Sequence, residues 1–266
     1  MARIWEADQV LTFGRAPMGR DMVNSVPDPS GHTYLDFNSP LSDARAAKLI
    51  AGLGVASRGH VLDLGCGWGE FLLRVAESEP SCVGTGIDAD VKAIERGRLN
   101  VADRGLDQRV TLAVGDISAY EAEADVVIAS GVSHAWGGTQ PMLAALKGTV
   151  RRGGKVLIGD GIWRRPPTDA ALHALEATAE DFLSCAAMVD VALAAGYRVL
   201  AVSETNDDEW DDFESRWCSG YEQWLLANSS HPEAPAARER VDDHRSRWLH
   251  GYRGVLGFCY LTLAAP

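Results

Sequence analysis

Short apolar runs alternate with amphipathic stretches along most of the chain. The runs cover residues 61–64, 83–87, 110–114, 125–130, 155–160 and 197–203. Runs this short, bounded by turn residues, are typical of buried strands. Helical spacing of apolar positions predicts helices at 41–53, 71–75, 91–103, 141–150 and 169–195. Strands that alternate with helices form parallel βαβ units, so the pattern predicts an α/β protein with a doubly wound, mostly parallel sheet.

Residues 206–252 interrupt the alternation. They are acidic and aromatic, lack a strand pattern, and repeat aromatic residues at helical spacing from Trp210 to Trp224. We expect a helical insertion here, with its second helix over 234–252, followed by a seventh strand at 255–263. The first 30 residues are rich in Gly, Pro, Asn and Ser and predict a loosely structured arm. We therefore expect one domain over 1–266, with an N-terminal helical arm or lid at 1–54, a core at 55–203, the insertion at 204–254 and a last strand at 255–266.

The first apolar run leads into three alternating glycines, Gly65, Gly67 and Gly69. A helix and a second strand follow, and that strand ends on Asp88. This is half of a mononucleotide-binding unit, in which glycines allow close approach of a ligand and the acid accepts hydrogen bonds from ribose hydroxyls. The spacing is G-x-G-x-G, whereas a dinucleotide site has G-x-G-x-x-G. The acid Asp63, two residues before the first glycine, suits a cationic ligand better than a pyrophosphate.

These residues resemble motif I of the class I S-adenosylmethionine (SAM)-dependent methyltransferases, and the resemblance extends over about residues 55–160. It implies SAM as the cofactor, S-adenosyl-L-homocysteine as its product, and a last strand inserted antiparallel between the fifth and sixth. Asp88 would then hold the ribose, Ala89 would flank the adenine, Asp116 would accept from the adenine amino group, and Ser130 would lie near the sulfonium. The implied cofactor residues are Asp63, Gly65, Cys66, Gly67, Gly69, Asp88, Ala89, Asp116, Ile117, Ser130 and Gly131.

Residues 37–42, 131–137, 159–167 and 208–211 resemble a narrower group of bacterial small-molecule methyltransferases. The expected reaction is an in-line displacement that methylates oxygen, nitrogen or carbon of a small molecule, with natural-product metabolism as one setting. Two other functions share the predicted features. An NAD-dependent oxidoreductase would share the half-fold and Asp88, but the glycine spacing and the C-terminal strand disfavour it. A non-catalytic SAM-binding or regulatory protein is the second alternative.

The acceptor side has several candidate residues and no decisive motif. His134 follows the fourth strand and is either a general base, since histidine titrates near neutral pH, or a residue that binds SAM or shapes the loop. Asp160 either orients the substrate or caps a turn. The aromatic residues of the insertion favour core packing over substrate contact. The substrate-binding candidates are Tyr34, Phe37, Asn38, Trp136, Trp163, Trp210, Glu214 and Trp217. We expect no metal site.

Charge and composition narrow the partners and the compartment. The net charge of −12 disfavours a nucleic-acid partner, because phosphate binding needs a basic surface. The sequence after the fourth strand, from Ser130 to Ser133, also lacks the Asp/Asn-Pro-Pro-aromatic run of DNA amino-methyltransferases. Five cysteines without paired spacing indicate free thiols in a reducing compartment. We find no secretory signal, transmembrane run or membrane-docking surface, and expect a cytoplasmic protein.

Overall fold

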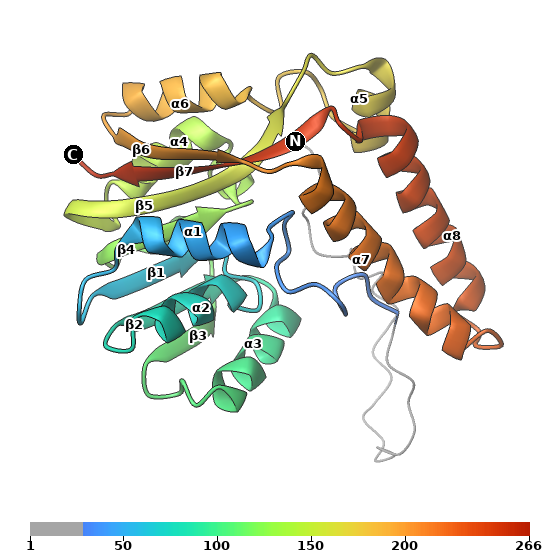
Figure 1. Ribbon diagram of the computed structural model, residues 1–266, viewed down its shortest axis with the longest axis horizontal. Coiled ribbons are helices and arrows are strands. Elements are labelled where there is room, and N and C mark those ends of the chain that lie inside the picture. The colour runs from blue at the N-terminus through green and yellow to red at the C-terminus, as the bar shows by residue number, and fades with distance from the viewer. Residues whose placement is uncertain (1–28) are drawn as a thin grey trace.

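The computed structural model describes residues 29–266, which form a seven-stranded sheet flanked by helices (Figure 1). The strands are β1 (His60–Leu64), β2 (Val83–Asp88), β3 (Val110–Val114), β4 (Ala124–Ser130), β5 (Val150–Trp163), β6 (Arg198–Glu204) and β7 (Leu256–Ala264). Their order is β3-β2-β1-β4-β5-β7-β6. Only β7 runs antiparallel, between β5 and β6, which confirms the predicted fold.

Helices cover both faces of the sheet. They are α1 (Asp43–Leu53), α2 (Glu70–Ser78), α3 (Val91–Asp103), α4 (Thr139–Leu146), α5 (Asp169–Leu175), α6 (Cys185–Ala194), α7 (Asp207–Ala227) and α8 (Ala234–Ser246), with a π-helical turn, η4, at Arg247–Tyr252. One face packs beneath α1, α2 and α3, and the other beneath α4 and α6. No helix among the described residues is both long enough and apolar enough to span a membrane.

Two predicted helices have different bounds in the structure. The stretch 141–150 is helical only to Leu146, and Val150 already belongs to β5. The stretch 169–195 is two helices, because Glu176 adopts a left-handed backbone (φ 49°) that ends α5, and Ser184 caps a new helix by accepting from the Ala187 N–H. Apolar periodicity continues across this break, so the sequence pattern concealed it.

Capping groups fix the helices next to the carboxyl edge of the sheet, the edge where the parallel strands end. Ser42 caps α1, and its hydroxyl accepts from the Arg45 N–H. Asn206 and Glu209 form a reciprocal capping box at the start of α7. Helices α7 and α8 lie side by side beyond this edge, so the insertion stands next to the strand ends (Figure 1).

Residues 29–42 cross from α7 to the α1–α3 side of the sheet, and we call this segment the strap (Figure 1). The greater part of the predicted N-terminal arm, residues 1–28, lies outside the described residues.

Candidate functional site

The glycine loop after β1 lies at the carboxyl edge with an open side. Gly65, Gly67 and Gly69 have φ of 76°, 54° and 75°, a left-handed backbone that favours glycine. A Cβ at Gly67 would meet no atom within 4 Å, whereas one at Gly65 would overlap Val132 in the loop after β4. The glycine loop therefore packs closely against the loop after β4 and leaves space for a ligand at Gly67.

Asp88 is oriented by two backbone donors. Its carboxylate accepts from the Gly67 N–H (2.7 Å) and the Asp90 N–H (2.8 Å), one on each oxygen. Each carboxylate oxygen can accept further hydrogen bonds, so Asp88 can also receive two hydroxyl groups of a ribose.

Asp63 is a buried carboxylate near the end of β1. It is 4% exposed, and none of residues 29–266 forms a hydrogen bond or ion pair with its side chain. Burial, together with the negative charge of Asp88, raises the pKa of Asp63 to about 7. A cationic group bound beside the loop would stabilise the ionised form, so these residues fit a ligand such as SAM.

The remaining cofactor candidates lie at the ends of neighbouring strands. Ala89 follows β2, Asp116 and Ile117 follow β3, and Ser130 and Gly131 follow β4. Asp116 caps a short turn by accepting from the Ser118 N–H (2.8 Å) and hydroxyl (2.7 Å), which lowers the Asp116 pKa. The Cys66 side chain instead packs towards Gly86 of β2. The strand order β3-β2-β1-β4 brings these positions together.

The two catalytic candidates, His134 after β4 and Asp160 in β5, have different environments. His134 is exposed on a short 3-10 turn, η3 (Ser133–Trp136). Asp160 is buried and accepts from the Gly161 N–H (2.9 Å) and the Thr139 hydroxyl (3.2 Å). Burial raises the pKa of Asp160, and hydrogen bonds from Ser133, Gly161 and Thr139 oppose the rise. Asp160 thus accepts hydrogen bonds from the segment after β4, while the His134 side chain of that segment is exposed to solvent.

The strap is attached to the glycine loop and to α3. Trp68, inside the glycine loop, donates its indole N–H to the Asp36 carbonyl (2.7 Å). The Arg96 guanidinium lies 4.1 Å from the centre of the Trp68 ring and donates to the His32 and Leu35 carbonyls (2.8 and 2.9 Å). Sequence reasoning missed both Trp68 and Arg96. The sequence signal that could have identified Trp68 is its position between Gly67 and Gly69, where a large side chain is unusual.

A chain of hydroxyls joins the strap to the end of β4. The Ser39 hydroxyl hydrogen-bonds the Tyr260 hydroxyl (3.0 Å), and Tyr260 also hydrogen-bonds Ser130. Gly159 makes room for this arrangement, because a Cβ there would come within 2.8 Å of the Tyr260 ring. The expected sulfonium-side residue Ser130 is therefore two hydrogen bonds from the strap.

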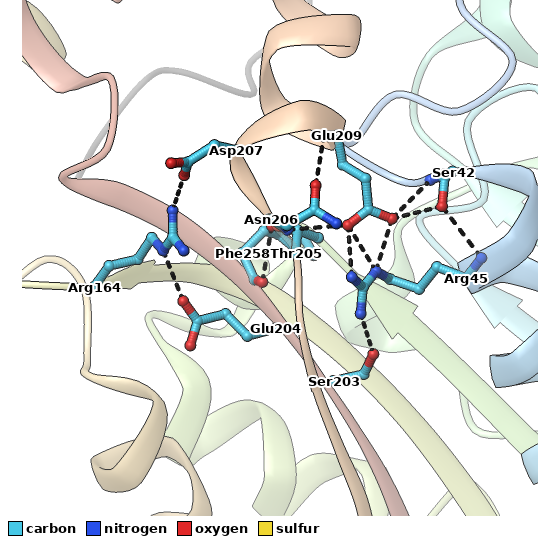
Figure 2. Close-up of polar contacts among 10 residues, drawn as sticks. All are labelled: Ser42, Arg45, Arg164, Ser203, Glu204, Thr205, Asn206, Asp207, Glu209 and Phe258. Carbon is cyan, nitrogen blue, oxygen red and sulfur yellow. Dashed lines mark hydrogen bonds and ion pairs between the residues drawn. The ribbon is translucent and has the colours of Figure 1, made fainter.

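Figure 2 shows the charged contacts that fix the start of α7. The Glu209 carboxylate is buried and accepts from Arg45 Nε (2.8 Å) and Nη2 (2.6 Å) and from the Ser42 hydroxyl (2.6 Å). These bonds hold the pKa of Glu209 at about 2 despite its burial. Arg45 also donates to the Ser203 hydroxyl (2.5 Å), so one side chain joins α1, β6 and α7.

A cavity of about 480 Å³ opens between the strap and the start of α7. Its apolar wall consists of Leu35, Phe37, Leu41 and Phe213. The charged residues around it are Asp36, Asp43, Asp208, Glu209, Asp212 and Arg216. Arg45 and Arg74 pair with Glu209 and Asp43 from outside the lining, so five carboxylates face three guanidinium groups and the cavity keeps a net negative charge.

The predicted substrate-binding residues do not form one cluster. Phe37 lines the cavity, its neighbours Tyr34 and Asn38 are exposed on the strap, and Trp136 is half-buried in η3. Trp163 is buried and donates its indole N–H to the Ala179 carbonyl (2.9 Å).

The substrate-binding candidates on α7 contact residues of α8 and η4. Glu214 accepts from the Tyr252 hydroxyl (2.7 Å) and is 2.6 Å from His244 Nε2. Trp217 stacks on His244, with ring centroids 3.8 Å apart, and Trp210 packs edge-on against Tyr252. These contacts belong to packing between α7, α8 and η4.

Comparison with known proteins agrees with this geometry. The methyltransferase-domain family matches residues 56–212. A SAM-dependent methyltransferase from Geobacter sulfurreducens, solved with S-adenosyl-L-homocysteine, superposes with a TM-score of 0.82 at 28% identity, over 89% of this chain and 96% of that one. The uncharacterized protein YjhP of Escherichia coli is 26% identical over 86% of this chain and 94% of its own length. Ribosomal RNA small subunit methyltransferase C of Pseudomonas entomophila is 29% identical over 59% of this chain and 47% of its own length.

Proposed function

The chain belongs to the methyltransferase-domain family and is a SAM-dependent methyltransferase, and we propose that it methylates a small molecule bound between the strap and α7. The cavity of about 480 Å³ carries this proposal, because ligand pockets for small molecules have volumes of about 300–1,000 Å³. Ser39 lines this cavity and connects through Tyr260 to Ser130, the residue expected beside the sulfonium.

On the donor side, the open space at Gly67 and at Gly131 would receive the cofactor. Asp88 would hold the ribose hydroxyls, and the buried Asp63 carboxylate would balance the cofactor's positive charge. When bound, SAM supplies a methyl carbon activated by the adjacent sulfonium. The chain then has to align the acceptor with that carbon and exclude water from it.

Proton removal is the second task for acceptors that carry a hydroxyl or amine. We assign proton removal to His134, because η3 places this exposed side chain just after Ser130, the residue expected beside the sulfonium. The buried Asp160 would hold the same loop through Thr139 and Ser133 and thereby position His134.

The acidic lining favours a neutral or cationic acceptor over a phosphate-bearing one. The net charge of the whole chain, −12, is also negative. A negative chain and a negative cavity both disfavour an RNA substrate, because RNA phosphates are negatively charged. The similarity to a ribosomal RNA methyltransferase covers under half of that protein's length, so we do not extend its substrate to this chain.

The proposal is tested by measuring S-adenosyl-L-homocysteine formation with panels of small amines, phenols and carboxylic acids, and with ribosomal RNA. We expect turnover with members of the amine or phenol panel and none with RNA. Phe37→Ala removes an apolar wall of the cavity and should raise the acceptor KM about tenfold. Phe182→Ala is the control, because Phe182 packs against Trp163 away from this cavity and should leave that KM unchanged. Turnover with RNA alone, or the reverse pattern for the two variants, would contradict the proposal.

Asp63 predicts a pH dependence of cofactor binding. Its pKa of about 7 means that the carboxylate ionises as the pH rises through neutrality, and only the ionised form attracts a cation. SAM affinity measured by calorimetry should therefore increase from pH 6 to pH 8, by up to about tenfold per unit below the pKa. Asp63→Asn should flatten this dependence. An equally steep profile in the variant would remove the role assigned to Asp63.

A further inference from the structure

Two cysteine thiols meet where α6 packs on the sheet. Cys185 is the first residue of α6, and Cys259 lies in the middle of β7. Their sulfur atoms are 3.3 Å apart, within hydrogen-bonding distance, although the two residues are 74 positions apart in sequence. We propose that Cys185 and Cys259 are an oxidation site that forms an intramolecular disulfide when it reacts with a small disulfide such as oxidised glutathione.

The geometry singles out this pair. A disulfide needs a sulfur–sulfur distance of about 2.0 Å, which these sulfurs reach by moving about 1.3 Å towards each other. All five cysteines are free thiols, and no other two among residues 29–266 lie within hydrogen-bonding distance. The Cys66 thiol, for comparison, points at the Gly67 carbonyl (3.5 Å).

The difference in burial gives the two thiols different roles. Cys185 is half-buried and Cys259 is fully buried, so Cys185 is the thiol that a small disulfide would meet first. The Cys185 thiolate attacks the small disulfide, forming a mixed disulfide and releasing one thiol. The Cys259 thiolate then attacks the Cys185 sulfur and releases the second thiol. The protein loses two electrons and two protons, and the small disulfide gains them to become two thiols.

The new bond would join the start of α6 to β7, which lies between β5 and β6. In the β-ladders, Cys259 pairs with Asp160 of β5 and with Glu204 of β6. Cys185 comes two residues after Leu183, whose carbonyl accepts from the Trp163 N–H (2.9 Å). The disulfide would therefore fix the connection between α5 and α6 onto the strands beside Asp160.

The test treats the purified chain with an excess of oxidised glutathione and then blocks the remaining thiols by alkylation under denaturing conditions. Mass spectrometry should show the loss of two hydrogen atoms, two unblocked cysteines and one cross-linked peptide that contains residues 185 and 259. The melting temperature should rise by about 5–10 °C, because a cross-link over this separation constrains the unfolded chain. Reduction should restore the original value.

Two variants of Cys185 and one matched control keep the test decisive. Cys185→Ser and Cys185→Ala should form no cross-link and show no increase in melting temperature on oxidation. Cys66→Ala removes another half-buried thiol and should still form the bond. Alkylation of both Cys185 and Cys259 after oxidation of the folded chain would overturn the proposal. So would a cross-link of Cys259 to a different cysteine. Neither outcome depends on the identity of the methyl acceptor.

Discussion

Arg45→Met should lower the free energy of unfolding by about 3 kcal/mol, the low end of the range for a broken buried ion pair. The substitution leaves the buried Glu209 carboxylate without its two guanidinium donors, so that among the described residues Ser42 and the Asn206 N–H remain to stabilise the charge. It also removes the side chain that joins α1, β6 and α7. Urea unfolding at pH 7, followed by circular dichroism, measures the loss.

Arg151→Met is the matched control, because its ion pair with Asp125 (2.7 Å) lies at the surface and should contribute under about 1 kcal/mol. A second check uses pH. The Glu209 pKa is lowered from its ordinary value of 4.5 to about 2, so its contribution is complete above pH 4.5 and disappears as the pH falls towards 2. The stability difference between wild type and Glu209→Gln should narrow over that window. Equal losses in Arg45→Met and Arg151→Met would contradict the assigned role of the pair.

His134→Ala should lower kcat by about 10²–10⁴-fold for a hydroxyl or amine acceptor, the usual effect of removing a general base. The reason is positional, since His134 stands on η3 directly after the strand end expected beside the sulfonium. The pH–rate profile should also change shape, because the group that accepts the proton would be gone. Steady-state kinetics from pH 5 to pH 9 measure both effects.

His173→Ala is the control for this experiment, because His173 is an exposed histidine on α5. Its kcat and pH profile should match those of the wild type. If His134→Ala keeps its turnover and its pH profile, His134 is not the base. A weaker SAM affinity at unchanged kcat would instead assign it to cofactor binding.

The strands and the glycine loop could be predicted from sequence because they depend on local chemistry. The apolar runs predicted all seven strands, and the glycine spacing with Asp63 and Asp88 predicted a cationic nucleotide ligand. Left-handed turns favour glycine, and a buried strand favours an uninterrupted apolar run, so both leave a signature within a few residues. The antiparallel place of β7 came from family resemblance, and the strand pairing confirms it.

The positions of the candidate substrate-binding residues depend on contacts between residues that are distant in sequence. The candidates Trp163, Trp210, Glu214 and Trp217 have helical or strand spacing that fits core and site equally well, and only packing shows that they lie against other helices and loops. The break between α5 and α6 was hidden because both helices continue one apolar pattern.

The sequence by itself thus determined the fold class, the glycine loop and the net charge of the molecule, which follow from residue type and short-range order. Only the tertiary structure decided what surrounds the cavity, since Arg45 and Glu209 are 164 positions apart and Ser39 and Tyr260 are 221 apart. It also decided which cysteines meet, because the antiparallel insertion of β7 brings Cys259 beneath α6. Residue spacing along the chain cannot encode such pairs, because the path of the whole sheet sets the distance between them.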